Sequence, residues 1–364
     1  MSQTLKEIAE QLERSDPAAI RLPLCFGGHR IDVLSNSEQL VERLSDYFQA
    51  FDEGESSREP DIVIRAHHRL PPELDLTFHE WSREPGKRTR KEAFCDLPDG
   101  RVVLKVRTGM QFLVGRDLRI AVGDCLTHPN QVVNFVNFQY TSHLMNQGLV
   151  LGHAAGVALG GQGLSLAGLS GGGKSTLALH LISSGLDFVS NDRLLLGPGP
   201  GGTRIFGVPK HPRINPGTAL ANPDLRSILD DERREALEKL SRDELWQLEE
   251  KYDALIDLVY GPGRIRLAAP CKALLILAWN HRNAASARFR AVSLAERRDL
   301  LDAVMKSPGP FFLPERGPAP KGYEPPDPTG YLEALRDLPV YEATGGVDFA
   351  AGVDFCRELL EQDG

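Results

Sequence analysis

The segment Gly168-Leu169-Ser170-Gly171-Gly172-Gly173-Lys174-Ser175, followed by Thr176, carries the strongest signal in the chain. It fits the pattern G-x-x-x-x-G-K-[ST] at every fixed position, which is the signature of a phosphate-binding P-loop between a strand and a helix. Its flanks agree with that pattern, because residues 164–167 are apolar and residues 176–184 have helical spacing. The segment therefore predicts an α/β fold built around a phosphate site.

The residue types of this loop suit a chain of phosphates. Glycines reach backbone angles closed to other residues, so successive N–H groups can point inward around an anion, and the helix start adds partial positive charge. We expect Lys174 to reach the β- and γ-phosphates and Ser175 to offer its hydroxyl to Mg²⁺. The predicted cofactors are ATP and Mg²⁺, although the loop does not choose ATP over GTP. A glycine-rich turn with an unrelated lysine is the alternative interpretation.

Upstream of the loop, the sequence predicts a hairpin. Residues 150–159 are small and apolar, residues 160–163 form a turn, and residues 164–167 are apolar again. Two strands joined by so short a turn must be antiparallel, because parallel strands need a crossover of about a dozen residues or more. We therefore expect a mixed sheet.

Downstream of the loop, Asp192 is the candidate for a second functional carboxylate. It stands where the apolar run 188–190 ends, and one helix between the loop and this run would return the chain to the same face of the sheet. Asp192 could act as an indirect metal ligand or as the base that takes a proton from an incoming hydroxyl. The alternative is a turn carboxylate that caps a hairpin. Asn191, beside it, can only hydrogen-bond.

The rest of the chain predicts two domains. Residues 1–125 alternate short strands with helical stretches and form a small N-terminal α/β domain, and residues 126–364 form the P-loop catalytic domain. A basic neighbourhood in the first domain is either a solvated hairpin loop or a docking surface for a substrate or an acidic partner. It comprises Arg83, Lys87, Arg88, Arg90 and Lys91.

The second domain is expected to contain several further elements. They are a helix at 131–147, a charged helical region at 223–258 with a break at 241–243, a strand at 272–279, a helix at 294–305, a proline-rich loop at 308–328, a helix at 331–337, a strand at 340–343 and a helix at 348–360.

Composition excludes several classes of protein. The 364 residues carry a net charge of −8 without a long basic block, which disfavours a nucleic-acid partner. No apolar run reaches the ~18 residues of a membrane span, and the N-terminus lacks the apolar core of a signal peptide. The five cysteines are scattered, and the histidines show no metal-ligand spacing. We expect a cytoplasmic protein with reduced thiols and no structural zinc.

Three segments together resemble the catalytic domain of HPr kinase/phosphorylase, and more closely the related kinases of the HprK-related kinase B type. They are VLGHAAGV at 150–157, GLSGGGKST at 168–176 and GLDFVSNDRLLL at 185–196. The resemblance implies the mixed-sheet nucleotide fold that this family shares with ATP-dependent phosphoenolpyruvate carboxykinase. It also implies that His153 belongs to the active site and that Asp192 transfers a proton. Related enzymes are often oligomeric, so a homo-oligomer is a candidate state.

The sequence departs from the family pattern in two places. Asn191 replaces the first of two aspartates, and the stretch Thr203-Arg204-Ile205-Phe206-Gly207 lacks the carboxylate of the family's Glu-x-Arg-Gly signature. Phosphorylase activity and HPr as the substrate are therefore both in doubt. The segment 208–216 instead looks like the version in the related kinases, with Lys210, His211 and Arg213 placed to contact a phosphate or substrate. Such kinases tend to be encoded beside a short amphipathic protein, which implies a protein or peptide partner.

Each of these residues also has a structural alternative. His153 could be a neutral buried histidine with one hydrogen bond, and the 210–213 loop could be an exposed basic loop. Arg264 follows a glycine-rich turn and is a candidate for stabilising charge on a transferred phosphoryl group.

The function that the sequence favours is an ATP- and Mg²⁺-dependent kinase, with a hydroxyl such as a serine side chain of a protein or peptide as acceptor. A small-molecule kinase on the same scaffold and a non-catalytic nucleotide-dependent binding switch are the alternatives.

Overall fold

The computed structural model describes residues 3–54, 58–82, 91–169, 171–241, 244–245, 248 and 250–362. The chain is a mixed α/β protein that divides into two compact units. Unit 1 comprises residues 1–148 and 307–326, and unit 2 comprises residues 149–306 and 327–364. Within the described ranges, no helix has the length and apolar character needed to cross a membrane.

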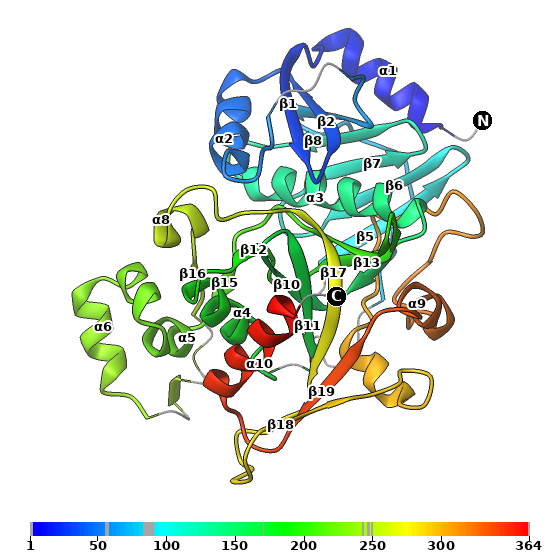
Figure 1. Ribbon diagram of the computed structural model, residues 1–364. Helices are drawn as coiled ribbons and strands as arrows, with labels where there is room; N and C mark the ends of the chain where they lie inside the picture. The colour runs from blue at the N-terminus through cyan, green and yellow to red at the C-terminus, as the bar shows by residue number, and fades with distance from the viewer. Residues whose placement is uncertain are drawn as a thin grey trace. The chain divides into compact units, whose positions relative to one another are not determined.

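Unit 1 is built on an eight-stranded mixed sheet with the order β1-β2-β3-β8-β7-β6-β5-β4 (Figure 1). Strands β1 and β2 form an antiparallel hairpin around Gly27-Gly28. The strands are β1 (Ile20–Phe26), β2 (His29–Ser35), β3 (Ile62–His68), β4 (His79–Glu80), β5 (Glu92–Leu97), β6 (Gly100–Lys105), β7 (Gln111–Gly115) and β8 (Arg119–Gly123), and the helices are α1 (Leu5–Ser15), α2 (Glu38–Phe48) and α3 (Pro129–Asn146).

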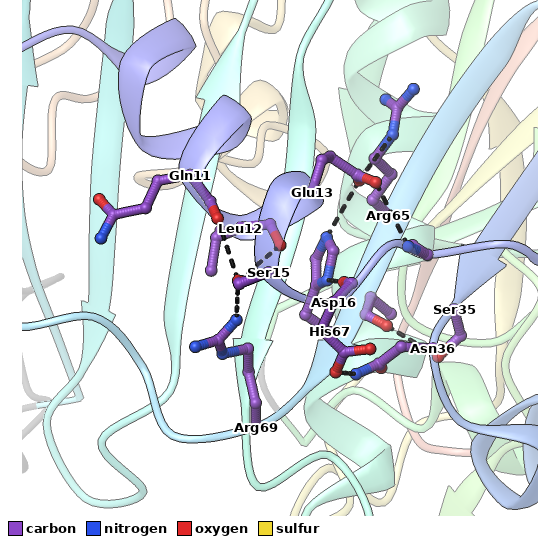
Figure 2. A network of polar contacts seen from close by, with 12 residues as sticks. Gln11, Leu12, Glu13, Ser15, Asp16, Ser35, Asn36, Arg65, His67 and Arg69 are labelled. Atoms are coloured by element: carbon purple, nitrogen blue, oxygen red, sulfur yellow. Dashed lines mark hydrogen bonds and ion pairs between the residues drawn. The ribbon is translucent and has the colours of Figure 1, made fainter.

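Helix α1 is fixed to the sheet by an apolar face and by a polar network (Figure 2). Leu5, Ile8 and Leu12 are buried on one side of the helix. At its carboxyl end, Glu13 accepts from the ring Nε2 of the fully buried His67 at 3.2 Å and pairs with Arg65 at 3.1 Å. The network therefore ties the end of α1 to β3.

The boundary between the units differs from the expected one at residue 125. Helix α3 belongs to unit 1, because its buried side chains pack on the aromatic core there: Phe135 lies 4.9 Å from Phe112 between ring centroids. The proline-rich segment 307–326 also returns to unit 1. Its Phe311 stacks on Phe138 at 4.8 Å, and the fully buried Arg101 donates to the carbonyl oxygens of two of its prolines.

Unit 2 contains a nine-stranded mixed sheet with the path β12-β10-β11-β17-β14-β13-β9, and β19 pairs with both β17 and β18. The expected antiparallel hairpin is confirmed, because β10 and β11 pair around the Gly160-Gly161 turn. The strands are β9 (Val150–Gly152), β10 (Ala154–Leu159), β11 (Gln162–Gly168), β12 (Asp187–Ser190), β13 (Leu194–Gly199), β14 (Gly202–Gly207), β17 (Ala268–Leu277), β18 (Arg288–Ala291) and β19 (Val340–Thr344).

Helices α4 (Lys174–Ser183) and α10 (Phe349–Glu361) contact each other, and both contact β11 and its neighbours (Figure 1). The other elements of unit 2 are a two-stranded sheet and short helices. They are β15 (Arg213–Ile214), β16 (Tyr252–Asp253), α5 (Pro216–Ala221), η1 (Pro223–Ile228), α6 (Asp231–Glu238), α8 (Ile256–Tyr260), η2 (Arg298–Ala303) and α9 (Pro328–Ala334).

Two expected helical regions are wrong in extent. The helix predicted at 294–305 is only the 3-10 turn η2, because Val304 accepts from the His153 N–H and Met305 pairs with Gly152, which draws the end of this segment into extended pairing. The charged region 223–258 is divided among η1, α6, β16 and α8, since Asn222 and Asp230 each cap a new helix and Tyr252 pairs with Ile214.

Candidate functional site

The topology of unit 2 brings three chain segments to one edge of the sheet. Strands β11, β17 and β19 are parallel, so their carboxyl ends lie at the same edge. Strand β10 is antiparallel to both β11 and β12, so β12 ends, and β10 begins, at that edge as well. The glycine-rich loop (residues 168–175), Asp192 and His153 therefore meet there. Their meeting follows from strand direction, which the sequence alone predicts only for the hairpin.

The glycine-rich loop takes a backbone path that requires glycine. Gly171 and Gly173 have φ angles of 81° and 82°, in the left-handed region that L side chains rarely adopt. The Gly172 N–H donates to the Leu169 carbonyl at 2.9 Å, which closes a tight turn. Ser170 lies outside the described residues.

Two aromatic side chains fix this loop. The Trp279 Nε1 donates to the Gly172 carbonyl at 2.8 Å, from a position just beyond the end of β17. A Cβ at Gly173 would lie 3.0 Å from the Phe349 ring, which shows how closely the first residue of α10 approaches the loop. Phe349 and Trp279 pack edge to face at 5.7 Å. The path of the loop is thus supported by two other elements.

Lys174 lies inside the loop that precedes it. Its Nζ donates to the Gly168 carbonyl at 2.9 Å, and the residue is 8% exposed. Burial lowers the pKa of Lys174, an effect that Asp192 opposes and Lys306 reinforces. Ser175 is half-buried in the first turn of α4. Thr176 faces α5 instead, with its hydroxyl 3.2 Å from that of Thr218.

His153 and Asp192 form a pair where two ladders of the sheet are interrupted. Gly152 pairs with Leu194 on one side of the gap, and Gly156 pairs with Ser190 on the other. In the gap, the His153 Nε2 lies 3.3 Å from the Asp192 Oδ1, with the Asp192 side chain 68% exposed. The hydrogen bond from His153 holds the pKa of Asp192 well below its usual range. Asp192 is therefore an ionised carboxylate at neutral pH.

Lys306 belongs to the same site, and sequence reasoning missed it. Its ammonium lowers the pKa values of both Lys174 and Asp192, so it lies within electrostatic range of the two. No motif surrounds it in the sequence, because it follows an apolar stretch and precedes the proline-rich segment. The pairing of Met305 with Gly152 and the hydrogen bond from the His153 N–H to the Val304 carbonyl bring it here.

The loop with Lys210, His211 and Arg213 begins beside the 190–193 turn, which carries Asp192. The Ser190 hydroxyl accepts from the Val208 N–H at 3.2 Å, which brings the start of this loop to the 190–193 turn. Burial lowers the pKa of Lys210, and Arg193 lowers it further. Arg213 pairs with Asp253 at 3.1 Å, and burial lowers the pKa of His211 to about 4. Lys210 is thus the member of this loop that is electrostatically coupled to Asp192.

The structure does not bring Arg264 to the glycine-rich loop. Its guanidinium donates to the carbonyls of Ile182 and Leu186, at 2.9 and 2.6 Å, and lies 3.5 Å from the Asp187 carboxylate. These groups lie at the carboxyl end of α4, whereas the loop lies at its amino end, about 15 Å away for a ten-residue helix. Arg264 therefore stabilises the end of this helix.

The polar groups that the site offers to a ligand include hydroxyl and carboxylate oxygens and lysine ammonium groups. Across the described residues, no three His, Cys, Asp or Glu side chains gather as a metal-ligand set. The arrangement offers backbone N–H groups and two lysines to an anion, and one ionised carboxylate to a hydroxyl. The cluster Arg83, Lys87, Arg88 and Arg90 lies outside the described residues.

Comparisons with solved structures include a distant likeness to a kinase/phosphatase. The structure resembles the HPr(Ser) kinase/phosphatase from Coxiella burnetii with a TM-score of 0.30 and 10% sequence identity, over 57% of this chain and 94% of that chain. No protein-family model matches the chain, and no curated protein matches it.

Proposed function

We propose that this protein is an ATP- and Mg²⁺-dependent kinase that transfers the γ-phosphate to a hydroxyl, such as a serine side chain of a protein or peptide. The observation that supports this most directly is that Lys174, Asp192 and His153, each predicted separately, meet at one edge of the unit 2 sheet. An anion-binding loop beside an ionised carboxylate is what phosphoryl transfer to a hydroxyl needs.

The loop fits a phosphate chain. Gly171 and Gly173 hold left-handed angles, and the first N–H groups of α4 have no acceptors within the helix. Lys174 would exchange its bond to the Gly168 carbonyl for bonds to phosphate oxygens. Because the lysine is buried, an anion beside it would be bound with little competition from water. The anion would in turn stabilise the ammonium and raise its lowered pKa.

The donor set also fits Mg²⁺, which prefers oxygen ligands. The Ser175 hydroxyl would hold the ion with Asp192 as an indirect ligand, and the ion supplies charge neutralisation to the phosphates when bound.

Asp192 would orient the acceptor hydroxyl and take its proton. Its lowered pKa makes it a weak base, so it cannot deprotonate the hydroxyl in advance. In a loose phosphoryl-transfer transition state, the acceptor hydroxyl need not lose its proton early. Most of the rate enhancement then comes from positioning the acceptor and the phosphoryl group. His153 would keep the carboxylate ionised and correctly placed.

The proposal is tested with γ-labelled ATP and a cell lysate as the source of acceptors. The wild type should label a discrete protein band, and Lys174→Ala should lose nucleotide binding. Asp192→Asn should keep binding within about threefold and lose transfer by about 10²–10⁴-fold. Arg264→Met is the matched control, because this cation contacts α4 away from the loop and should leave transfer unchanged.

The alternative functions give different outcomes in the same experiment. Label in a small-molecule fraction would identify a small-molecule kinase. Nucleotide binding without transfer to any fraction would identify a binding switch, and normal turnover by Asp192→Asn would show that the role given to this carboxylate is wrong.

A further inference from the structure

Lys306 is held at the site by its backbone. Met305 pairs with Gly152, and the Val304 carbonyl accepts from the His153 N–H at 2.6 Å. The Tyr331 hydroxyl accepts from the Lys306 N–H at 3.1 Å and also donates to the Leu151 carbonyl. Tyr331 is only 5% exposed, so this anchor is buried. The position of Lys306 beside His153 is therefore fixed by three contacts.

The charged groups near Lys306 include Lys174, Asp192 and Arg193. Lys306 follows Met305, which pairs with Gly152 next to His153, and His153 lies 3.3 Å from Asp192. From this position the Lys306 ammonium lowers the pKa of both Lys174 and Asp192. Arg193 is a further positive charge that acts on Asp192. The neighbouring residue Asn191 is neutral and adds no second carboxylate. Two lysines at the edge where the glycine-rich loop lies supply the positive charge that would bind and stabilise a phosphoryl group there.

We propose that Lys306 is a second phosphoryl-binding lysine. It would bind the phosphoryl group while this group is transferred from the nucleotide held by Lys174 to the acceptor held by Asp192. This rests on the proposed kinase function. In the transfer, the bond from the γ-phosphorus to the bridging β–γ oxygen breaks and a bond to the acceptor oxygen forms. The acceptor proton goes to Asp192, and Lys306 keeps its protons and stabilises the equatorial oxygens.

The test uses Mg²⁺, ADP and aluminium fluoride, whose planar complex imitates the transferred phosphoryl group, so no acceptor has to be known. The affinity for Mg·ADP is measured with and without aluminium fluoride. The ratio of these two affinities is the gain in affinity from the analogue. Transition-state analogues bind tighter than ground-state ligands, so the wild type should show a large gain. Lys306→Gln should bind Mg·ADP within about threefold of the wild type and lose about 10²-fold of the gain.

Two further variants separate chemistry from folding. Lys306→Arg should restore part of the gain because it restores the charge, and Lys239→Gln, an exposed lysine at the end of α6, should keep all of it. A wild type that gains nothing from fluoride, or a Lys306→Gln that keeps the full gain, overturns this inference. A wild type that does not bind Mg·ADP at all overturns the kinase proposal instead.

Discussion

The pair His153–Asp192 shows how a single contact sets the chemistry of a residue. Asp192 is largely exposed, yet its pKa lies well below the ordinary range because His153 donates to the charged carboxylate. The sequence indicated both residues, but it did not indicate their contact. That contact arises where one ladder of the sheet ends and the next begins, and strand register is a tertiary property.

His153→Gln is expected to raise the pKa of Asp192 towards its ordinary value, because the ring that stabilises the charged form is lost. Since a carboxylate must be ionised to accept a proton, the rate of the variant should begin to fall at a higher pH than that of the wild type. Transfer rates measured from neutral pH down to below 3.8, the ordinary pKa of an aspartate, check this. If the rates of the wild type and the variant fall at the same acidic pH, His153 does not lower the pKa of Asp192.

At the scale of elements, the sequence predicted the hairpin β10–β11, the loop and helix α4, because their signals are local. It did not predict that Trp279 and Phe349 support the loop. They come from the ends of β17 and α10, far along the chain, and they reach the loop only because β17 is parallel to β11. The overestimated helix at 294–305 has the same cause, since pairing with β9 outweighed helical periodicity.

Trp279→Phe tests the support of the loop. The variant keeps the aromatic packing and removes the 2.8 Å hydrogen bond to the Gly172 carbonyl. A neutral hydrogen bond contributes about 0.5–1.5 kcal/mol, so we expect Mg·ATP affinity to fall by about three- to tenfold, with a small loss of thermal stability. Calorimetric titration measures this, and an affinity equal to that of the wild type would mean that the bond does not order the loop.

At the scale of the whole molecule, the chain crosses between the two units more often than the sequence predicted. It leaves unit 2 after Lys306 and re-enters it at Asp327, and the segment between them belongs to unit 1. The prolines scattered through this segment leave no periodicity from which to assign it to a unit. Its anchor is Arg101, which also pairs with Asp96. The partners of Arg101 within the segment are backbone carbonyls, so they leave no trace in the sequence.

Arg101→Met is expected to release this segment from unit 1. The side chain is fully buried and donates to the carbonyls of Pro310 and Pro320, so its loss leaves two acceptors without their donor. We expect a loss of about 2–4 kcal/mol in unfolding free energy. Limited trypsin digestion should cleave faster after Arg316 and Lys321, and an unchanged cleavage rate would argue against the anchor.

Acid should weaken unit 1 through His67. Burial lowers the pKa of His67 below its ordinary value of 6.5, so between these two values the unfolded chain binds more protons than the folded one. Stability is then fully present above about pH 6.5 and falls as the pH drops towards the folded value. Urea midpoints at pH 8 and pH 5.5 measure the loss. His67→Gln should show a shallower pH dependence, and an identical slope would exclude His67 as the cause.

The kinase proposal depends on whether the loop at 168–175 binds a nucleoside triphosphate. Calorimetric titration with Mg·ATP of the wild type and Lys174→Ala, both checked for equal folding by thermal melting, decides this. We predict saturable one-to-one binding by the wild type and a loss of affinity of at least about 10²-fold in the variant. No binding by the wild type, or equal binding by both proteins, would contradict it.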